Sequence, residues 1–267
     1  WQFTQLIAGA NLGRVEGRQT LRADPHALWP GSDAAIEGEL RVQVDNLATW
    51  GAWVPAGWRL GGQVDAALRI AGQLGAPQLI GEAHGRELAL RNAIEGVALA
   101  DGGFDARFDG TSAQLVRLRF AAGEGELVAS GDARLGAEPQ ARLELSATRA
   151  AVLGRVDRRV VASGAATLRM EGDKIAIEGD FRADSGRVDI SRADAPSLGD
   201  DVTVRRAGDA DAQDALEAAA ARRTSRAVDL RLKVDLGPHF RLRGRGIDTR
   251  LSGALTLTTP NGLLAAH

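Results

Sequence analysis

Histidine and the acidic residues are the main side chains in this sequence that could take part in catalysis or metal binding. The histidines stand far apart, and no two have the spacing of a metal site on one helix; they are His26, His84, His239 and His267. The sequence contains neither a G-x-S-x-G nucleophile elbow nor a phosphate-binding P-loop, and cysteine is absent. We therefore interpret the histidines as solvated or turn residues, and we predict no catalytic residue, no cofactor and no metal. The chain is predicted not to be an enzyme.

Two short polar clusters each have a chemical and a structural interpretation. Asp200 and Asp201 are adjacent carboxylates, the ligand type that Ca²⁺ prefers, but one pair supplies too few ligands and a polar turn is favoured. The run Gly123-Glu124-Gly125 lacks the third glycine of a dinucleotide-binding fingerprint and is predicted to be a hairpin turn. Neither cluster indicates a reaction.

A tryptophan cluster interrupts the pattern of the chain between Asn46 and Gly61. Trp50, Trp53 and Trp58 have three interpretations: an aromatic cap over one rim of a groove, an anchor at a membrane interface, or a local packing cluster. The sequence alone leaves the three open.

Composition narrows the class of partner. The formal net charge is -2, so the surplus of basic residues that nucleic-acid binding requires is missing. No stretch approaches the roughly 18 apolar residues that span a bilayer. The first residue is Trp1 rather than Met, so we expect a fragment of a longer protein whose anchor or signal lies elsewhere.

Short segments that alternate apolar and polar residues between frequent glycines predict a chain made of strands. These strands must position whatever this chain binds. Residues 228–236 are the clearest case: Val228, Leu230, Leu232, Val234 and Leu236 alternate with charged residues, which places the two sets on opposite faces of a sheet. Roughly 15 to 18 strands follow from such segments. After Gly244 and Gly246 the apolar residues move from even-numbered to odd-numbered positions, and we predict a turn or bulge there.

The apolar members of these segments are the candidate binding residues of one sheet face. They are Leu40, Val42, Val44, Val64, Leu68, Ile70, Phe104, Phe108, Leu143, Leu145, Leu168, Met170, Ile175, Ile177, Val188, Ile190, Val228, Leu230, Leu232, Val234, Phe240, Leu242, Leu255 and Leu257. Core burial and ligand contact demand the same apolar chemistry, and on the residues alone core packing is the first interpretation.

Four segments are expected along the chain. Residues 1–35 are predicted to be an irregular or short-helical lead-in with part of a groove strand, within which 13–32 breaks the strand pattern. Residues 36–205 and 227–267 are predicted to form the β-sheet. Between them, 206–226 is rich in Ala, Asp and Arg and is predicted to be a loop or a short helix.

A long sheet with one apolar face must cover that face or bind something with it. A sandwich usually includes aromatic side chains in its core, whereas aromatic residues are 4% here and tyrosine is absent. A β-helix usually shows a fixed repeat and an Asn ladder, and neither is present. A curled antiparallel meander with an aliphatic groove is favoured, about 80 Å long for strands spaced about 4.8 Å apart.

Four stretches carry a resemblance to a known family. They are 72–81, of the form G-x-L-x-x-P-x-L-x-G; the run from Gly123 to Gly131; the glycine-marked stretch from Arg158 to Val202; and 228–257, which contains D-L-R-L-K-V-D-L-G and F-R-L-R-G-R-G-I-D-T-R-L-S-G. In order and spacing, from about Ile36 onward, they resemble the TamB and AsmA-like group of bacterial envelope proteins, and within it the carboxy-terminal part of TamB. Residues 206–226 depart from that family pattern.

The resemblance implies a β-taco, which is a curled sheet with an aliphatic groove. It also implies a periplasmic location in a Gram-negative bacterium, an inner-membrane anchor in the full-length protein, and a TamA-like outer-membrane barrel as partner. The expected function is to carry phospholipid acyl chains between the inner and outer membranes. The alternatives are a module that assembles outer-membrane β-barrel proteins or autotransporters with the barrel partner, and a passive secreted β-solenoid.

Overall fold

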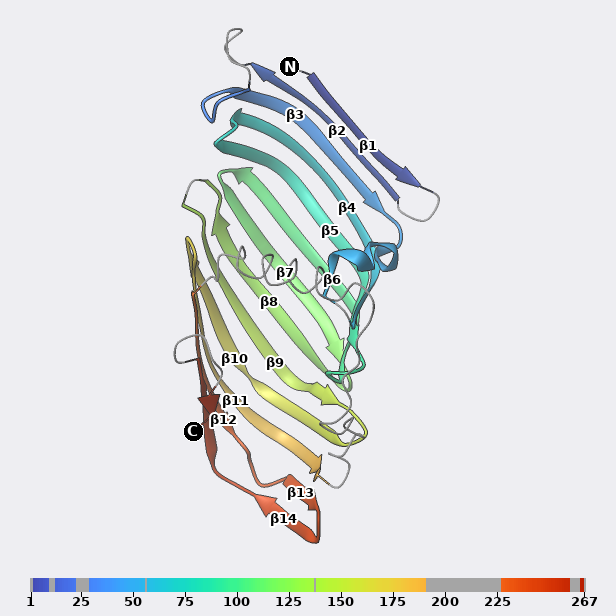
Figure 1. Cartoon of the computed structure of the whole chain (residues 1–267), viewed down its shortest axis with the longest axis vertical. Coiled ribbons are helices and arrows are strands. Elements are labelled where there is room, and N and C mark those ends of the chain that lie inside the picture. The colour runs from blue at the N-terminus through green and yellow to red at the C-terminus, as the bar shows by residue number, and fades with distance from the viewer. Residues whose placement is uncertain are drawn as a thin grey trace, which may run out of the picture.

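The computed structural model describes residues 2–9, 13–22, 29–55, 57–136, 138–190, 227–259 and 265–266. These residues form one curled, unclosed sheet, in which the strands from β1 to β12 follow one another in chain order (Figure 1). The strands are β1 (Gln2–Gly9), β2 (Gly13–Arg22), β3 (Ala35–Val44), β4 (Trp58–Gln73), β5 (Ala76–Asn92), β6 (Val97–Gly110), β7 (Ser112–Ala122), β8 (Gly125–Arg134), β9 (Gln140–Gly154), β10 (Arg158–Glu171), β11 (Lys174–Asp189), β12 (Ala227–Asp235), β13 (Phe240–Gly244), β14 (Ile247–Leu251), β15 (Ala254–Thr258) and β16 (Ala265–Ala266). The predicted all-β fold, an elongated and curled sheet, is confirmed.

Neighbouring strands pair antiparallel from β1 to β11, but the next pairings are parallel. Both β12 and β13 run parallel to β11, so that Ala227 lies beside Lys174 and Arg243 lies beside Asp189. A parallel pair requires its connection to return along the whole strand. The residues of that connection, 191–226, include Asp200, Asp201 and the predicted loop at 206–226, and they lie outside the described residues.

The lead-in differs from its prediction, because the described part of residues 1–35 contains two full strands. β1 and β2 pair along their whole lengths, and β2 continues onto β3. On the face that these strands share with Leu40, the apolar residues Phe3, Val15 and Leu21 are interrupted by Gln5, Gly17 and Gln19, so the apolar alternation that marks the later strands is broken. Glycine and glutamine between apolar residues at the inward positions weaken the period-two signal of a strand.

The tryptophan segment contains a short 3-10 helix, η1 (Leu47–Trp53). The Asn46 side chain caps it by accepting a hydrogen bond from the backbone N–H of Ala48 at 3.0 Å. Trp50 is half-buried on this helix, and Trp58 begins β4 opposite Asn92. The side chain of Trp53 lies outside the described part of the structure.

Both turns expected from glycine are present. Gly123 and Glu124 form the β7–β8 turn, with Ala122 paired to Gly125. Arg245 and Gly246 join β13 to β14 with φ values of 49° and 82°, the left-handed conformation that a two-residue hairpin turn requires.

Bulges curl the sheet. The register shifts in the pairings from β4 to β8 and from β9 to β11, in most cases toward the end of the strands that carries the β5–β6 turn. Three exposed charged residues beside these shifts have a left-handed backbone: Glu87 (φ 52°), Asp101 (φ 48°) and Arg149 (φ 46°). Each bulge bends its strand and increases the local twist. The recurrence of the shifts in successive strands produces a trough rather than a flat sheet.

Replacing Glu87 by glycine is expected to leave the free energy of unfolding unchanged or to raise it by up to about 1 kcal/mol. The left-handed conformation costs a residue with a Cβ about 1–2 kcal/mol, whereas glycine costs about 0.5–1 kcal/mol in conformational entropy. Gln114→Gly, in the regular part of β7, is the control and should lower it by about 0.5–1 kcal/mol. Urea denaturation measures both. Equal destabilisation by the two variants would contradict a strained bulge at Glu87.

Candidate functional site

The candidate binding residues share one face of the sheet. Residues paired directly across neighbouring strands lie on the same face, so a row can be followed from strand to strand. One such row crosses ten strands from β3 to β12: Val42, Ala66, Ala83, Ala106, Leu115, Gly131, Leu143, Leu168, Ile177 and Leu230. The rows on either side contain most of the other predicted residues. We call this the apolar face.

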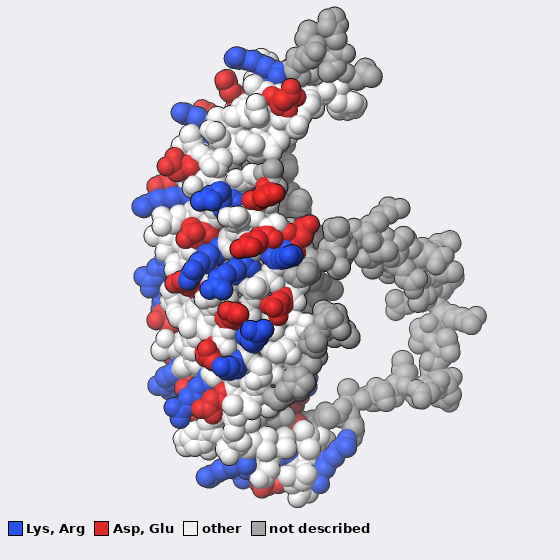
Figure 2. Space-filling model, turned by 90° about the vertical axis from the view of Figure 1, so that its left-hand side faces the viewer, with Lys and Arg blue, Asp and Glu red and all other residues white. Residues whose placement is uncertain are grey.

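The opposite face is charged. The row one residue further along contains Arg41, Ala67, Glu82, Arg107, Gln114, Asp132, Arg142, Arg169, Ala176 and Asp229. Basic and acidic side chains are interspersed in the view of Figure 2, taken from the left-hand side of Figure 1. We call this the charged face.

Most side chains of the apolar face are only partly covered. Of the predicted residues, Val44 is buried, Val228 and Leu255 are 39% and 38% exposed, and the others are half-buried. Among the described residues, full burial is reached by small side chains such as Ala122 and Ala150, and by no large one. A second layer of strands would bury the inner residues completely. The described chain therefore leaves its apolar face open along much of its length.

Sequence reasoning missed several members of this face. Register adds Leu79, Leu90, Leu99, Leu115, Leu118, Phe120, Leu127 and Phe181. In β7 the face passes from Leu115 to Leu118 because a register shift lies between them, so the alternation breaks within the strand. Elsewhere Gly and Ala occupy neighbouring positions on the face and hide the pattern.

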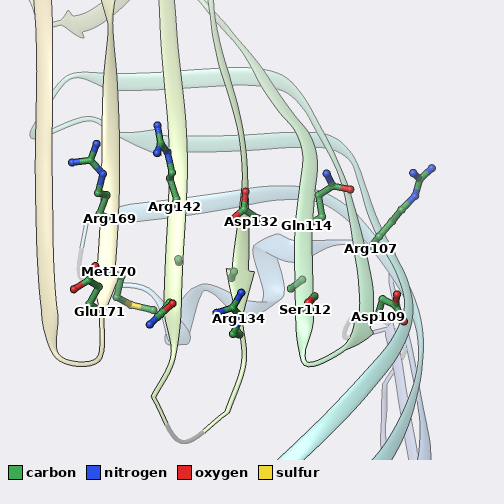
Figure 3. Close-up of a pocket in the computed structure, with 14 residues that line it drawn as sticks. Arg107, Asp109, Ser112, Gln114, Asp132, Arg134, Arg142, Arg169, Met170 and Glu171 are labelled. Atoms are coloured by element: carbon green, nitrogen blue, oxygen red, sulfur yellow. The ribbon is translucent and has the colours of Figure 1, made fainter.

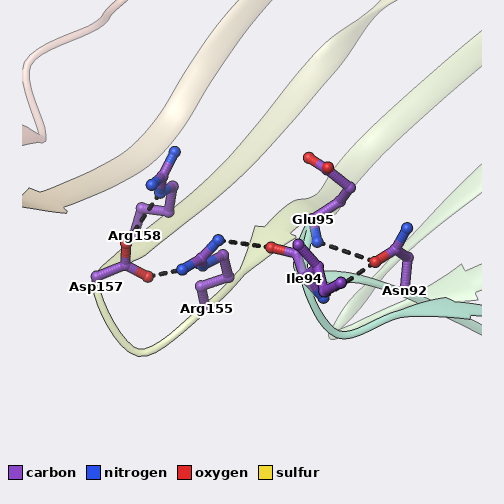
Figure 4. A network of polar contacts seen from close by, with 6 residues as sticks. All are labelled: Asn92, Ile94, Glu95, Arg155, Asp157 and Arg158. Carbon is purple, nitrogen blue, oxygen red and sulfur yellow. Dashed lines mark hydrogen bonds and ion pairs between the residues drawn. The ribbon is translucent and has the colours of Figure 1, made fainter. Parts of the chain in front are cut away.

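At one side of the sheet, two turns that are distant in the sequence contact each other across the curl. The backbone N–H of Gly154 donates to the carbonyl of Gly96 at 2.7 Å. Nearby, Arg155 Nη1 donates to the carbonyl of Ile94 at 2.6 Å, as Figure 4 shows. These contacts join the β5–β6 turn to the end of β9, with β7 and β8 lying between β6 and β9 in the sheet. A Cβ on Gly96 would lie 2.5 Å from Arg155 Cγ, so this contact needs glycine.

Side chains fix both turns of this contact, which we call the clasp and which comprises residues 92–96 and 154–158. The buried Asn92 accepts hydrogen bonds from the backbone N–H groups of Ile94 and Glu95, each at 3.0 Å. Asp157 accepts from Arg155 at 2.8 Å and from Arg158 at 3.1 Å. Partial burial raises the pKa of Asp157, but the hydrogen bonds from Arg158 and Arg155 outweigh it and hold that pKa below its usual value.

The apolar face forms a small core near the clasp. Ala122, Ala147 and Ala150 are buried there, and Leu99, Leu127 and Phe181 pack against them. Because these residues come from β6 to β11 and touch across the curl, the apolar face is the concave one. We call the concavity the groove, which is filled beside the clasp and open elsewhere among the described residues.

The other end of the strands carries a hollow of about 630 Å³ among charged side chains (Figure 3). Its arginines include Arg107, Arg142 and Arg169, each of which also lies within ion-pair distance of a glutamate on the charged face. Asp132 stands between Arg107 and Arg142 in the figure. Such a mixed and paired lining is typical of a solvated face rather than of a ligand site.

His84 lies on the charged face. Among the described histidines, it makes the shortest contact with a carboxylate. Its Nδ1 lies 2.7 Å from Asp105 Oδ1, and its Nε2 lies 3.5 Å from Glu82 Oε2. The hydrogen bond to Asp105 raises the pKa of His84 above its ordinary value. No group of three or more His, Cys, Asp or Glu residues is arranged for a metal ion among the described residues, and none of their helices is long and apolar enough to cross a membrane.

Comparison with known proteins assigns a family model to the second half of the fold. The model of the TamB C-terminal domain matches residues 116–265, which run from β7 to β16 and make up more than half of the chain. No curated protein and no solved structure matches the chain. The sequence resemblance to this family is thus confirmed.

Removing the Asn92 side chain is expected to destabilise the fold. Asn92→Ala leaves two N–H groups of the clasp without their acceptor, and the free energy of unfolding should fall by about 1–3 kcal/mol. Gln114→Ala removes an exposed amide from the charged face and should change it by less than about 0.5 kcal/mol. Urea denaturation compares the two, and a similar small effect for both would show that the clasp does not hold the curl.

The protonation of His84 is expected to depend on Asp105. Because the pKa is raised in the folded state, protonated His84 adds stability at pH values below its unfolded pKa, and that stability is lost as pH rises through the folded pKa. Asp105→Asn should return the pKa toward the ordinary value for histidine. Titration of the His84 ring signals by nuclear magnetic resonance, in the unchanged chain and in Asp105→Asn, measures this. An unchanged His84 pKa in Asp105→Asn would refute the assignment.

Proposed function

The chain belongs to the TamB family, and from this premise we propose that its groove carries phospholipid acyl chains between the two membranes of the Gram-negative envelope. The family acts in transport and assembly in that envelope. The full-length protein, on this proposal, is anchored in the inner membrane and works with a TamA-like barrel in the outer membrane.

The half-buried apolar face carries the proposal. An acyl chain leaving a bilayer loses about 0.8 kcal/mol for each CH₂ group that enters water. Contact with aliphatic side chains removes most of that cost, provided that those side chains are accessible. Leu143, Leu168 and Ile177 meet this condition, because each is half-buried with no described second layer over it.

Continuity of the face supports transport rather than storage of one ligand. The row from Val42 to Leu230 contains only aliphatic residues and glycine over ten strands, a span of about 40 Å at about 4.8 Å per strand. A row without a polar anchor binds many acyl chains weakly instead of one tightly. Weak and uniform contact allows a lipid to slide along the row while its headgroup stays in water.

Small residues give the groove its depth near β4 to β6. Ala66, Ala83 and Ala106 are directly paired neighbours in the row, between Val42 and Leu115. Their short side chains leave space over the sheet that larger aliphatic residues on the flanking strands border. On this proposal, an acyl chain lies over these alanines.

A second function, assembly of outer-membrane β-barrel proteins, has its own observation. β1 pairs only with β2 among the described strands, so its other edge presents unpaired backbone N–H and C=O groups. An extended client segment can add to such an edge as a further strand. The apolar face would then hold the alternate side chains of that client. A passive β-solenoid is disfavoured, because it requires a closed and fully buried core.

Photo-crosslinking at adjacent alanines tests the proposal. Ala66 lies on the apolar face and Ala67 on the charged face of the same strand, so benzoylphenylalanine at each position forms a matched pair. With the chain produced in a bacterial periplasm, we expect phospholipid adducts from position 66 and none from position 67. Mass spectrometry of the adducts identifies the species.

Each other outcome contradicts lipid transport in a different way. Adducts to unfolded barrel proteins at position 66, without lipid, would favour the assembly function. Equal labelling at both positions would show that the probe reports collisions rather than a groove. Absence of any adduct at position 66 would indicate a dry face, and circular dichroism of both variants confirms that the sheet is intact.

A further inference from the structure

Four arginines lie side by side on the charged face at the C-terminal end of the described sheet. Arg159 of β10 pairs directly with Arg187 of β11, Arg187 with Arg241 of β13, and Arg241 with Arg250 of β14. Like charges placed directly opposite each other destabilise a sheet. Elsewhere on this face opposite charges often face each other, as Glu39 faces Arg69. Arg142 and Arg169 are also directly opposed, but each lies within ion-pair distance of a glutamate. The arginine row is therefore an exception that folding alone does not explain.

One carboxylate neutralises a single member of the row. Arg241 donates from Nε and Nη2 to the two carboxylate oxygens of Asp248, each at 2.6 Å. That pairing, with the positive charges of Arg243 and Arg187 nearby, lowers the pKa of Asp248. Within the described part of the chain, Arg187 and Arg250 form no ion pair with a carboxylate. Their guanidinium groups are available to an external anion.

The β13–β14 hairpin extends this positive charge to the end of the molecule. Its 12 residues from Phe240 to Leu251 include four arginines and one aspartate. Among the described strands, β14 pairs only with β13, and the hairpin lies at the lower end of Figure 1. Lys and Arg side chains are visible at the same end in Figure 2. At the tip, beside Arg245, Ile247 is 49% exposed.

The shape of the row indicates what it binds. Four strands at about 4.8 Å spacing place the arginines over about 14 Å in a line. A linear array on an open sheet fits a planar surface of phosphates better than one small anion. Guanidinium groups bind phosphate oxygens in pairs, and clusters of four or more basic residues bind anionic bilayers. An exposed isoleucine at the tip adds an apolar contact with the interface.

We propose that this arginine surface, composed of Arg159, Arg187, Arg241, Arg243, Arg245 and Arg250, docks on a membrane that carries anionic phospholipids. The docking surface is on the charged face, so it is separate from the groove. It does not require that the groove carry lipid. It places one end of the groove at a bilayer surface, with the phosphates of the headgroups against the arginines.

Co-flotation of the whole chain with vesicles tests the docking. One set of vesicles is phosphatidylcholine alone, and the other is an equal mixture of phosphatidylcholine and phosphatidylglycerol. We expect binding to the mixed vesicles that weakens as salt is added, because salt screens exposed charges. Arg187→Gln with Arg250→Gln should weaken it by about fivefold for each arginine, and this double variant leaves the Arg241–Asp248 pair intact.

A matched control separates local docking from bulk charge. Arg142→Gln with Arg169→Gln removes a second pair of directly opposed arginines, on β9 and β10, and changes the net charge by the same amount. This control should bind the mixed vesicles as the unchanged chain does. Thermal unfolding should show that the Arg187/Arg250 variant is at least as stable as the unchanged chain, since it removes repulsion from the row.

Three results would overturn the proposal. The first is absence of binding to the mixed vesicles, including the case in which the chain binds only acidic proteins. The second is equal weakening by both double variants, which indicates an effect of net charge. The third is equal binding to both kinds of vesicle, which indicates apolar contact through the groove. Lipid adducts in the groove are measured separately, so either proposal can fail while the other stands.

Discussion

The described sheet is a single layer of strands with no second layer packed against it, and this constraint determines how far its side chains are buried and what holds its curl. From β3 to β12 the inward side chains touch their neighbours along and across the strands, but little of the described chain covers them from above. Each inward side chain therefore gives only part of the free energy that full burial of its apolar surface would give. Hydrogen bonds between long neighbouring strands, rather than a three-dimensional core, hold most of the curl, and the clasp region adds the small core that does exist.

The sequence predicts the faces of this sheet well and its edges poorly. Alternation places Leu143, Leu168 and Leu230 on one face because side-chain direction follows a period of two in every strand. The same period does not indicate which strands pair or in which direction. Nothing in residues 227–235 therefore predicts that β12 runs parallel to its neighbour rather than antiparallel. β1 and β2 escaped prediction because glutamine and glycine interrupt the apolar residues at their inward positions.

Contacts between distant turns are beyond such pattern reading. Arg155 and Ile94 belong to turns about 60 residues apart in the chain, and each turn by itself resembles any polar hairpin connection. Their meeting depends on the summed bend of the intervening strands, which the left-handed residues Glu87, Asp101 and Arg149 help to set. Charged residues at bulges look like ordinary surface residues in a sequence. The structure was needed to show that they shape the groove.

The clasp also decides how the groove can deform. It joins the strands along one side of the sheet only, and the hairpin turns on the opposite side, such as Gly110 to Ser112, have no equivalent cross-link between β6 and β9 among the described residues. Bending of the sheet that preserves the hydrogen bonds between strands is therefore expected to be largest at the unlinked side. On the proposed function, the aperture there would widen for a branched or paired acyl chain and narrow again, while the clasp would limit such movement on the linked side. A groove that is stiff on one side and compliant on the other would accept ligands of different cross-section.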